Sequence, residues 1–122
     1  MNVIVKTVSL RLFLFLIPIL LIPQTSYSGT VTSGWVTIET IALGWNVKRV
    51  NLSFNSETDP VPNPNNCSSS TSASIDEDQV NLDHLYSLAL AAFSAGKKIQ
   101  LTLYDDVCSY NGRPKILSIT AK

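Results

Sequence analysis

The chain has 122 residues, with nine basic and nine acidic side chains, so its formal net charge is zero. A chain of this length forms one small domain, and the lack of a basic patch argues against nucleic acid as a partner. With two cysteines and one histidine it offers a poor metal site. We therefore expect neither a metal nor a cofactor.

The first 28 residues have the pattern of a secretory signal peptide. Two basic residues precede an apolar run at 12–22, and a small residue stands before the expected cut after Ser28. An uncleaved membrane anchor is the alternative, but this run is shorter than the roughly 20 residues that a spanning helix needs. We expect a mature domain of residues 29–122 that is secreted or periplasmic and is not stably inserted in a membrane.

The cysteines predict a crosslink. Cys67 and Cys108 are an even pair in a small exported chain, a pattern that indicates one disulfide. Because the bond would close a long loop, the chain-entropy model values it at about 4 kcal/mol.

Two β-rich runs come first in the mature chain. Residues 34–43 favour a strand, and residues 47–54 alternate apolar and polar side chains, so the two predict an antiparallel hairpin with a turn at 44–46. Residues 55–74 form a loop rich in proline, asparagine and serine. Because long unstructured loops are unusual in compact domains, we expect a short polar edge strand within 68–75.

Residues 81–103 read as an amphipathic helix, a glycine stop and an alternating strand. Gly96 supplies the left-handed position that ends many helices, and the apolar period then changes from 3.6 to 2 along residues 99–103. The side chains expected on the core face of the helix are Leu82, Leu85, Tyr86, Ala89, Ala92 and Phe93.

The opposite face of this helix carries small, uncharged side chains where a solvated helix normally carries lysine and glutamate. Ser87, Ala91 and Ser94 lie within about 60° of one direction. Two interpretations stay open: a mildly polar exposed face, or a face that packs closely on a neighbouring subunit. These three residues are our candidate oligomer interface.

The remaining chain predicts two strands. Residues 98–104 form the first, Asn111-Gly112 is a strong tight-turn signal, and 115–120 form the second. The predicted order is therefore two strands, a weaker third strand, one helix and two further strands. This is a mostly β fold with one helix, which we interpret as a small five-stranded, OB-fold-like barrel.

The stretch 82–103, LDHLYSLALAAFSAGKKIQLTL, with a cysteine on either side, resembles the small exported OB-fold proteins similar to the B subunit of subtilase cytotoxin. A looser resemblance spans residues 34–120. The resemblance to this family implies a ring of five subunits that binds sialylated glycans on host cells and carries a catalytic A-type subunit. In such rings the helices line the central pore.

The sequence has few features that indicate an enzyme. His84 is the only histidine and lies in the first helical turn beside Asp83, where a surface or capping role is expected; a triad would need a nucleophile within reach. Asp76, Glu77 and Asp78 could hold calcium, but they lack the spacing of an EF-hand loop. We interpret them as a solvated acidic turn and expect no enzyme.

Four aromatic residues are candidate ligand contacts: Trp35, Trp45, Tyr104 and Tyr110. Aromatic faces stack on sugars, and Trp and Tyr keep a polar group for hydrogen bonding. Trp45 is predicted at a turn and Tyr110 beside the Asn-Gly turn. The alternative is that Trp35 and Tyr104 fill the core or a strand face.

Two functional hypotheses follow from these features. The first is an exported, non-catalytic, glycan-binding B-type subunit that oligomerises and docks or delivers a partner. The alternative is a monomeric secreted or periplasmic inhibitor or envelope factor without glycan binding.

Overall fold

A computed structural model describes residues 29–44 and 47–122 of the chain. The elements in this part are β1 (Thr30–Val36), β2 (Ile38–Leu43), β3 (Val50–Phe54), β4 (Ser72–Ile75), α1 (Leu82–Ala95), β5 (Ile99–Cys108) and β6 (Pro114–Ala121). The predicted fold class, mostly β with one helix, is confirmed. The expected signal peptide at 1–28 and the candidate ligand residue Trp45 lie outside the described residues.

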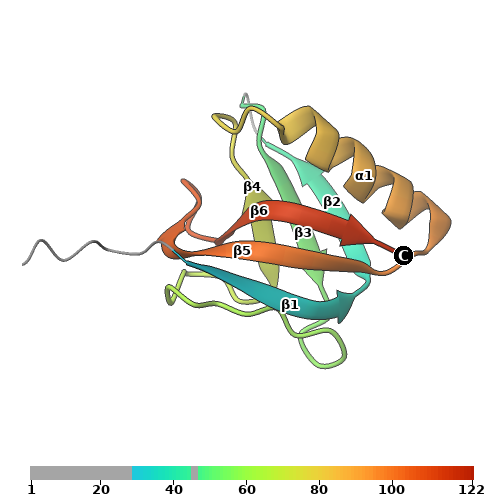
Figure 1. Cartoon of the computed structure of the whole chain (residues 1–122), viewed down its shortest axis with the longest axis horizontal. Helices are drawn as coiled ribbons and strands as arrows, with labels where there is room; N and C mark the ends of the chain where they lie inside the picture. Colours follow the sequence, from blue (N-terminus) through green and yellow to red (C-terminus); the bar gives the residue numbers. More distant parts are fainter. Residues whose placement is uncertain (1–28, 45–46) are drawn as a thin grey trace, which may run out of the picture.

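The strands form one six-stranded sheet in the order β1-β5-β6-β4-β3-β2. Neighbouring strands are antiparallel except β4 and β6, which are parallel. The two end strands of the sheet, β1 and β2, are consecutive in the chain, with only Thr37 between them. The sheet is therefore strongly curved, and its two ends come together at Thr37 (Figure 1). β1 and β2 are not paired with each other, and the sheet is therefore not a closed barrel.

The break at Thr37 corrects the prediction of one strand over 34–43 and raises the strand count from five to six. The backbone N–H of Thr37 donates to Asp59 Oδ2 at 2.8 Å, so a loop side chain takes the hydrogen bond that a ladder would otherwise use. β1 then pairs with β5, and β2 pairs with β3. The predicted hairpin exists only in its second half.

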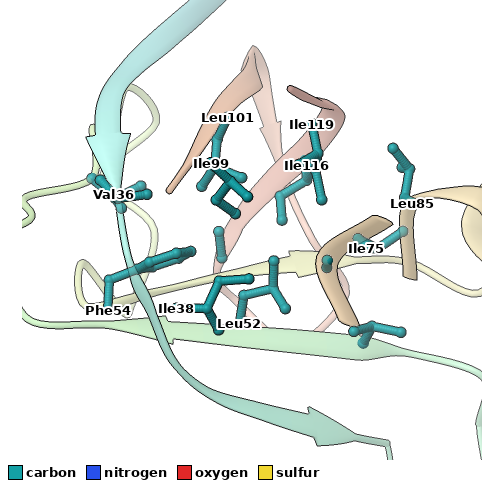
Figure 2. Close-up of a cluster of buried hydrophobic side chains, with 14 of the residues drawn as sticks. Val36, Ile38, Leu52, Phe54, Ile75, Leu85, Ile99, Leu101, Ile116 and Ile119 are labelled. Carbon is teal, nitrogen blue, oxygen red and sulfur yellow. The ribbon is translucent and has the colours of Figure 1, made fainter. Parts of the chain in front are cut away.

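The hydrophobic core fills the space that the curved sheet encloses, and all six strands contribute to it (Figure 2). Except where a register shift separates Ile116 from Ile119 on β6, its strand residues alternate with outward-facing ones, as expected for half-buried strands. They are Val36, Ile38, Val50, Leu52, Phe54, Ala73, Ile75, Ile99, Leu101, Leu103, Ile116 and Ile119. α1 completes the core by packing against β6 and β2.

The helix begins after Asn81 and ends at Gly96, which takes φ 63° as predicted. Four of the expected core residues are buried, and they recur at spacings of three and four: Leu82, Leu85, Ala89 and Ala92. Phe93 was expected in the core but is 42% exposed, because the buried stripe is narrow and Phe93 lies about 100° round the helix from Ala92. In the described part of the chain, no helix combines the length and apolarity needed to cross a membrane.

β4 corrects the prediction of a polar edge strand. It lies in the middle of the sheet, between β3 and β6, and all four of its residues are buried. Ala73 and Ile75 belong to the hydrophobic core, whereas Ser72 and Ser74 face the other side. The connection between β5 and β6 covers that second side. Because β4 carries small polar residues, the sequence does not predict this burial.

The predicted disulfide between Cys67 and Cys108 is confirmed, with 5.8 Å between the two Cα atoms. It joins the loop before β4 to the last residue of β5. Asn63 closes this loop further, since its Oδ1 accepts from the Cys67 N–H at 2.8 Å and its Nδ2 donates to the Cys67 carbonyl at 2.9 Å. A disulfide is compatible with an oxidising extracellular or periplasmic environment.

Candidate functional site

A cavity of about 430 Å³ opens on the outer side of the sheet. The segment from β2 to β3 forms one wall, and the β5–β6 connection forms the other. Its lining residues are Ala42, Gly44, Val47, Arg49, Asn51, Ser53, Asn111 and Arg113. Asn51 and Ser53 line it because they alternate along β3 with the core residues Val50, Leu52 and Phe54.

Beneath the cavity lies a network that we call the polar cluster. It combines side chains of β3, β4, β6 and the β5–β6 connection that hydrogen-bond or ion-pair with one another. Its members are Arg49, Asn51, Ser72, Ser74, Asp76, Ser109, Asn111, Arg113 and Lys115.

Asn51 occupies the centre of the polar cluster. Its Oδ1 accepts from Ser74 Oγ at 2.5 Å, from Asn111 Nδ2 at 2.7 Å and from Arg113 Nη1 at 3.5 Å. A guanidinium can only donate, so the contact with Arg113 agrees with an oxygen at this end of the amide. With Oδ1 engaged by the cluster, the Nδ2 donor is the end of Asn51 that remains for the cavity.

Arg113 is the cation of the cavity that has no compensating carboxylate in the part of the chain that the structure describes. Its Nε donates to Ser72 Oγ at 2.7 Å, and its Nη1 contacts Asn51 Oδ1. The ion pairs between described residues involve Arg49 and Lys115 but not Arg113. A half-buried guanidinium with neutral neighbours is a strong donor for a carboxylate or phosphate oxygen.

Asp76 anchors the other half of the cluster and is the exception in the predicted solvated acidic turn, where Glu77 and Asp78 are exposed. It is fully buried, with Oδ1 3.5 Å from Arg49 Nε and Oδ2 3.3 Å from Lys115 Nζ. Arg49 Nη2 also donates to both oxygens of Glu77, at 3.2 and 2.9 Å. Two carboxylates therefore compensate the charge of Arg49, unlike that of Arg113.

Lys115 is held as a cation by this arrangement. Its partial burial lowers the pKa of the ammonium, but its close contact with Asp76 and the charges of Asp76 and Asp78 outweigh burial, so its pKa is raised above the ordinary 10.5. The Lys115 Nζ also lies 5.6 Å from the ring centres of both Tyr104 and Tyr110. Rings at this distance attract a cation.

Of the three aromatic candidates in the described part of the chain, Tyr110 is the one next in sequence to a lining residue of the cavity. It precedes the lining residue Asn111, is 67% exposed, and its ring centre is 5.8 Å from Arg49 Cζ. Its hydroxyl donates to Asp78 Oδ2 at 2.9 Å, and this hydrogen bond, with the charge of Asp78, raises the pKa of Tyr110. Trp35 instead lies under Lys122, 4.2 Å from Nζ to the ring centre, and neither it nor Tyr104 lines the cavity.

The candidate interface residues Ser87, Ala91 and Ser94 are all exposed on α1. Leu90 and Phe93 lie beside them and are 41% and 42% exposed. The helix therefore presents an uncharged face to its surroundings from its second turn onward. His84 is exposed in the first turn, where a surface role was expected.

The sequence did not predict the most important residues of the cavity. Asn51, Asn111 and Arg113 come from two segments about 60 residues apart, and no local pattern connects them. The one usable signal was the outward position of Asn51 in the alternating strand. Among residues 29–44 and 47–122, no group of three or more His, Cys, Asp or Glu side chains is placed to hold a metal ion.

Comparison of the chain with protein-family models, with curated proteins and with solved structures gave no match in any of the three.

Proposed function

We propose that the protein is an exported, non-catalytic binding protein whose cavity takes the acidic group of a glycan. The observation that carries the proposal is Arg113, a half-buried cation without a carboxylate partner among the described residues, facing a cavity of about 430 Å³. Asn51, in the wall formed by β2 and β3, adds a second N–H donor to the same cavity. Arginine and amide donors in one recess suit a carboxylate, because each N–H can meet one of its oxygens.

The topology supports a carbohydrate ligand. We propose an OB-fold-like architecture in which β1 and β2 count as one bent strand, so that the six strands reduce to the five of a partly open barrel. OB-folds bind oligosaccharides on the face of their second and third strands, between the loops that join strands one and two and strands four and five. In this numbering those parts are β3, β4 and the β2–β3 and β5–β6 connections; β3 and the two connections supply most of the residues that line the cavity.

Export is the second component of the proposal. The signal-peptide pattern of residues 1–28 motivates it, and the Cys67–Cys108 bond suits an oxidising compartment. Recovery of the mature protein outside the cytoplasm with residue 29 at its N-terminus would support this. Cytoplasmic protein that retains residues 1–28 would contradict it.

Self-association is the third component, and a ring of five that docks a catalytic A-type subunit is its specific form. The uncharged, exposed face of α1 supports it, because Ala91 and its small neighbours allow close approach and Leu90 and Phe93 add apolar area. Light scattering should give the mass of an oligomer, and Ala91→Glu should reduce it to a monomer that stays folded. If the unmodified protein is a monomer at high micromolar concentration, the alternative of a monomeric inhibitor or envelope factor is favoured.

The binding proposal is tested with Arg113→Gln, which removes the charge and keeps a polar side chain. Affinity should be measured by calorimetry for oligosaccharides that end in sialic or glucuronic acid and for their neutral counterparts. Loss of a charged hydrogen bond should weaken acidic ligands by about tenfold or more, whereas Lys97→Gln, an exposed lysine that does not line the cavity, should change nothing. Equal binding of acidic and neutral ligands, or an unaffected Arg113→Gln variant, would refute an acid-binding cavity.

A further inference from the structure

The Asn111-Gly112 pair of the β5–β6 connection has a reactivity that ligand binding does not use. An asparagine followed by glycine is open to deamidation, since glycine has no side chain to shield its backbone nitrogen. The Gly112 nitrogen attacks Cγ of Asn111, the Cγ–Nδ2 bond breaks, and Nδ2 leaves as ammonia with the proton of the Gly112 N–H. Water then opens the resulting succinimide ring to aspartate or isoaspartate.

The folded protein holds both reacting groups in hydrogen bonds. Asn111 Nδ2 donates to Asn51 Oδ1 at 2.7 Å, and Asn111 Oδ1 accepts from Ser74 Oγ at 3.1 Å and from Ser109 Oγ. The Gly112 N–H donates to the Ser109 carbonyl at 2.9 Å. Attack requires the amide to turn and the Gly112 N–H bond to break, so the reaction proceeds from a locally opened state of the connection.

The product would change the charge of the cavity. Replacing Nδ2 by an oxygen turns the contact with Asn51 Oδ1 into two opposed acceptors. Arg113 Nη1 contacts that same Asn51 oxygen, so the new carboxylate would lie beside the guanidinium and attract it. Arg113 would then have an internal counter-ion.

We infer that Asn111 is a deamidation site whose conversion to aspartate closes the cavity to acidic ligands. The modification itself stands on the chemistry and contacts of Asn111 and Gly112. Its effect on ligands rests on the proposed function. The two parts therefore need separate measurements.

The modification is measured by mass spectrometry of the peptide that contains Asn111, after incubation at mildly alkaline pH. Oxidised, folded protein is compared with the same protein reduced and unfolded in urea, and Asn111→Ala sets the background from other amides. The exchange of NH₂ for OH should accumulate at Asn111 in the unfolded sample and several-fold more slowly in the folded one. Equal rates would refute the protection by the folded contacts, and an unfolded sample that stays unmodified at Asn111 would overturn the assignment.

The consequence is measured with Asn111→Asp, which creates the product directly, and Asn111→Ala, which removes the same amide without adding charge. Asn111→Asp should bind the sialic-acid oligosaccharide about tenfold more weakly than Asn111→Ala, a difference of about 1.4 kcal/mol. Equal affinity of the two variants would refute the closing of the cavity. If the unmodified protein binds no acidic ligand, the proposed function and the closing effect both fail, while the mass measurement still decides the modification.

Discussion

Both faces of β4 are buried, but one packs through apolar contacts and the other through polar contacts. On one face Ala73 and Ile75 lie in the hydrophobic core with 0% exposure. On the other, Ser72 and Ser74, together with Asp76 just beyond the strand, are at most 4% exposed and lie under the β5–β6 connection. A central strand can therefore carry polar side chains on alternate positions if a second segment supplies each of them with a partner.

The difference decides how each face responds to substitution. Apolar burial is non-directional, so its loss scales with the volume removed. A hydrogen bond contributes only about 0.5–1.5 kcal/mol net, but a buried polar group deprived of its partner costs more than that. The core face should tolerate substitutions that keep the buried volume. On the polar face, the loss of a single hydrogen-bonding atom should already lower the free energy of unfolding.

The largest effect should come from the core face. Ile75→Ala removes a fully buried side chain and leaves a cavity, which should lower the free energy of unfolding by about 4 kcal/mol in urea denaturation. Leu43→Ala, on a side chain that is 61% exposed, should change it by less than about 0.5 kcal/mol. Similar effects for the two would mean that the core lies elsewhere.

The next largest effect should come from the ion pairs of the polar face. Asp76→Asn keeps the shape but leaves Arg49 and Lys115 without their buried partner, at a cost of about 2–3 kcal/mol because water still reaches both cations. Asp78→Asn is the matched control; its side chain is 50% exposed, so it should cost less than about 1 kcal/mol. If both substitutions lower the free energy of unfolding equally, the burial of Asp76 adds nothing to the stabilisation by its ion pairs.

A smaller effect should follow from one hydroxyl. Ser74→Ala removes the donor that contacts the Oδ1 atoms of Asn51 and Asn111, which should cost about 1–2 kcal/mol. Because Asn51 would then be free to turn, affinity for an acidic oligosaccharide should also fall. Ser53→Ala, at a half-buried position on the neighbouring strand β3, is the control for stability. A stable Ser74→Ala variant with unchanged affinity would show that the hydroxyl does not orient Asn51.

The smallest effect concerns alkaline pH. The pKa of Lys115 is raised in the folded protein, so its stabilising contribution is fully present below the ordinary pKa of 10.5 and is lost as pH rises through the folded value. Tyr110, with a pKa raised above 10.0, has the same sign. The melting temperature should therefore fall at strongly alkaline pH, less so for Lys115→Met than for Lys97→Met. Parallel profiles for the two variants would contradict this.

The sequence predicted those parts of the fold that local periodicity determines. The 3.6 period and Gly96 located α1, alternation located β3, β5 and β6, and the cysteine pair predicted the crosslink. The break at Thr37 was missed because it depends on a hydrogen bond from the Thr37 N–H to Asp59, 22 residues away. The site was missed for a related reason: Arg113 matters because no carboxylate among the described residues pairs with it, and only the fold defines which side chains are near it.

The one-residue junction between β1 and β2 also sets the order in which the molecule can fold. β2 can pair with β3 soon after both are synthesised, but β1 must wait for β5, since Thr30 pairs with Tyr104 and Val36 with Ile99. Contacts between residues so distant in sequence form late and slowly, because a long loop has to close before they contribute. The first strand of the domain thus stays unpaired until nearly the whole chain has been made, and its free edge is exposed to other chains during that time.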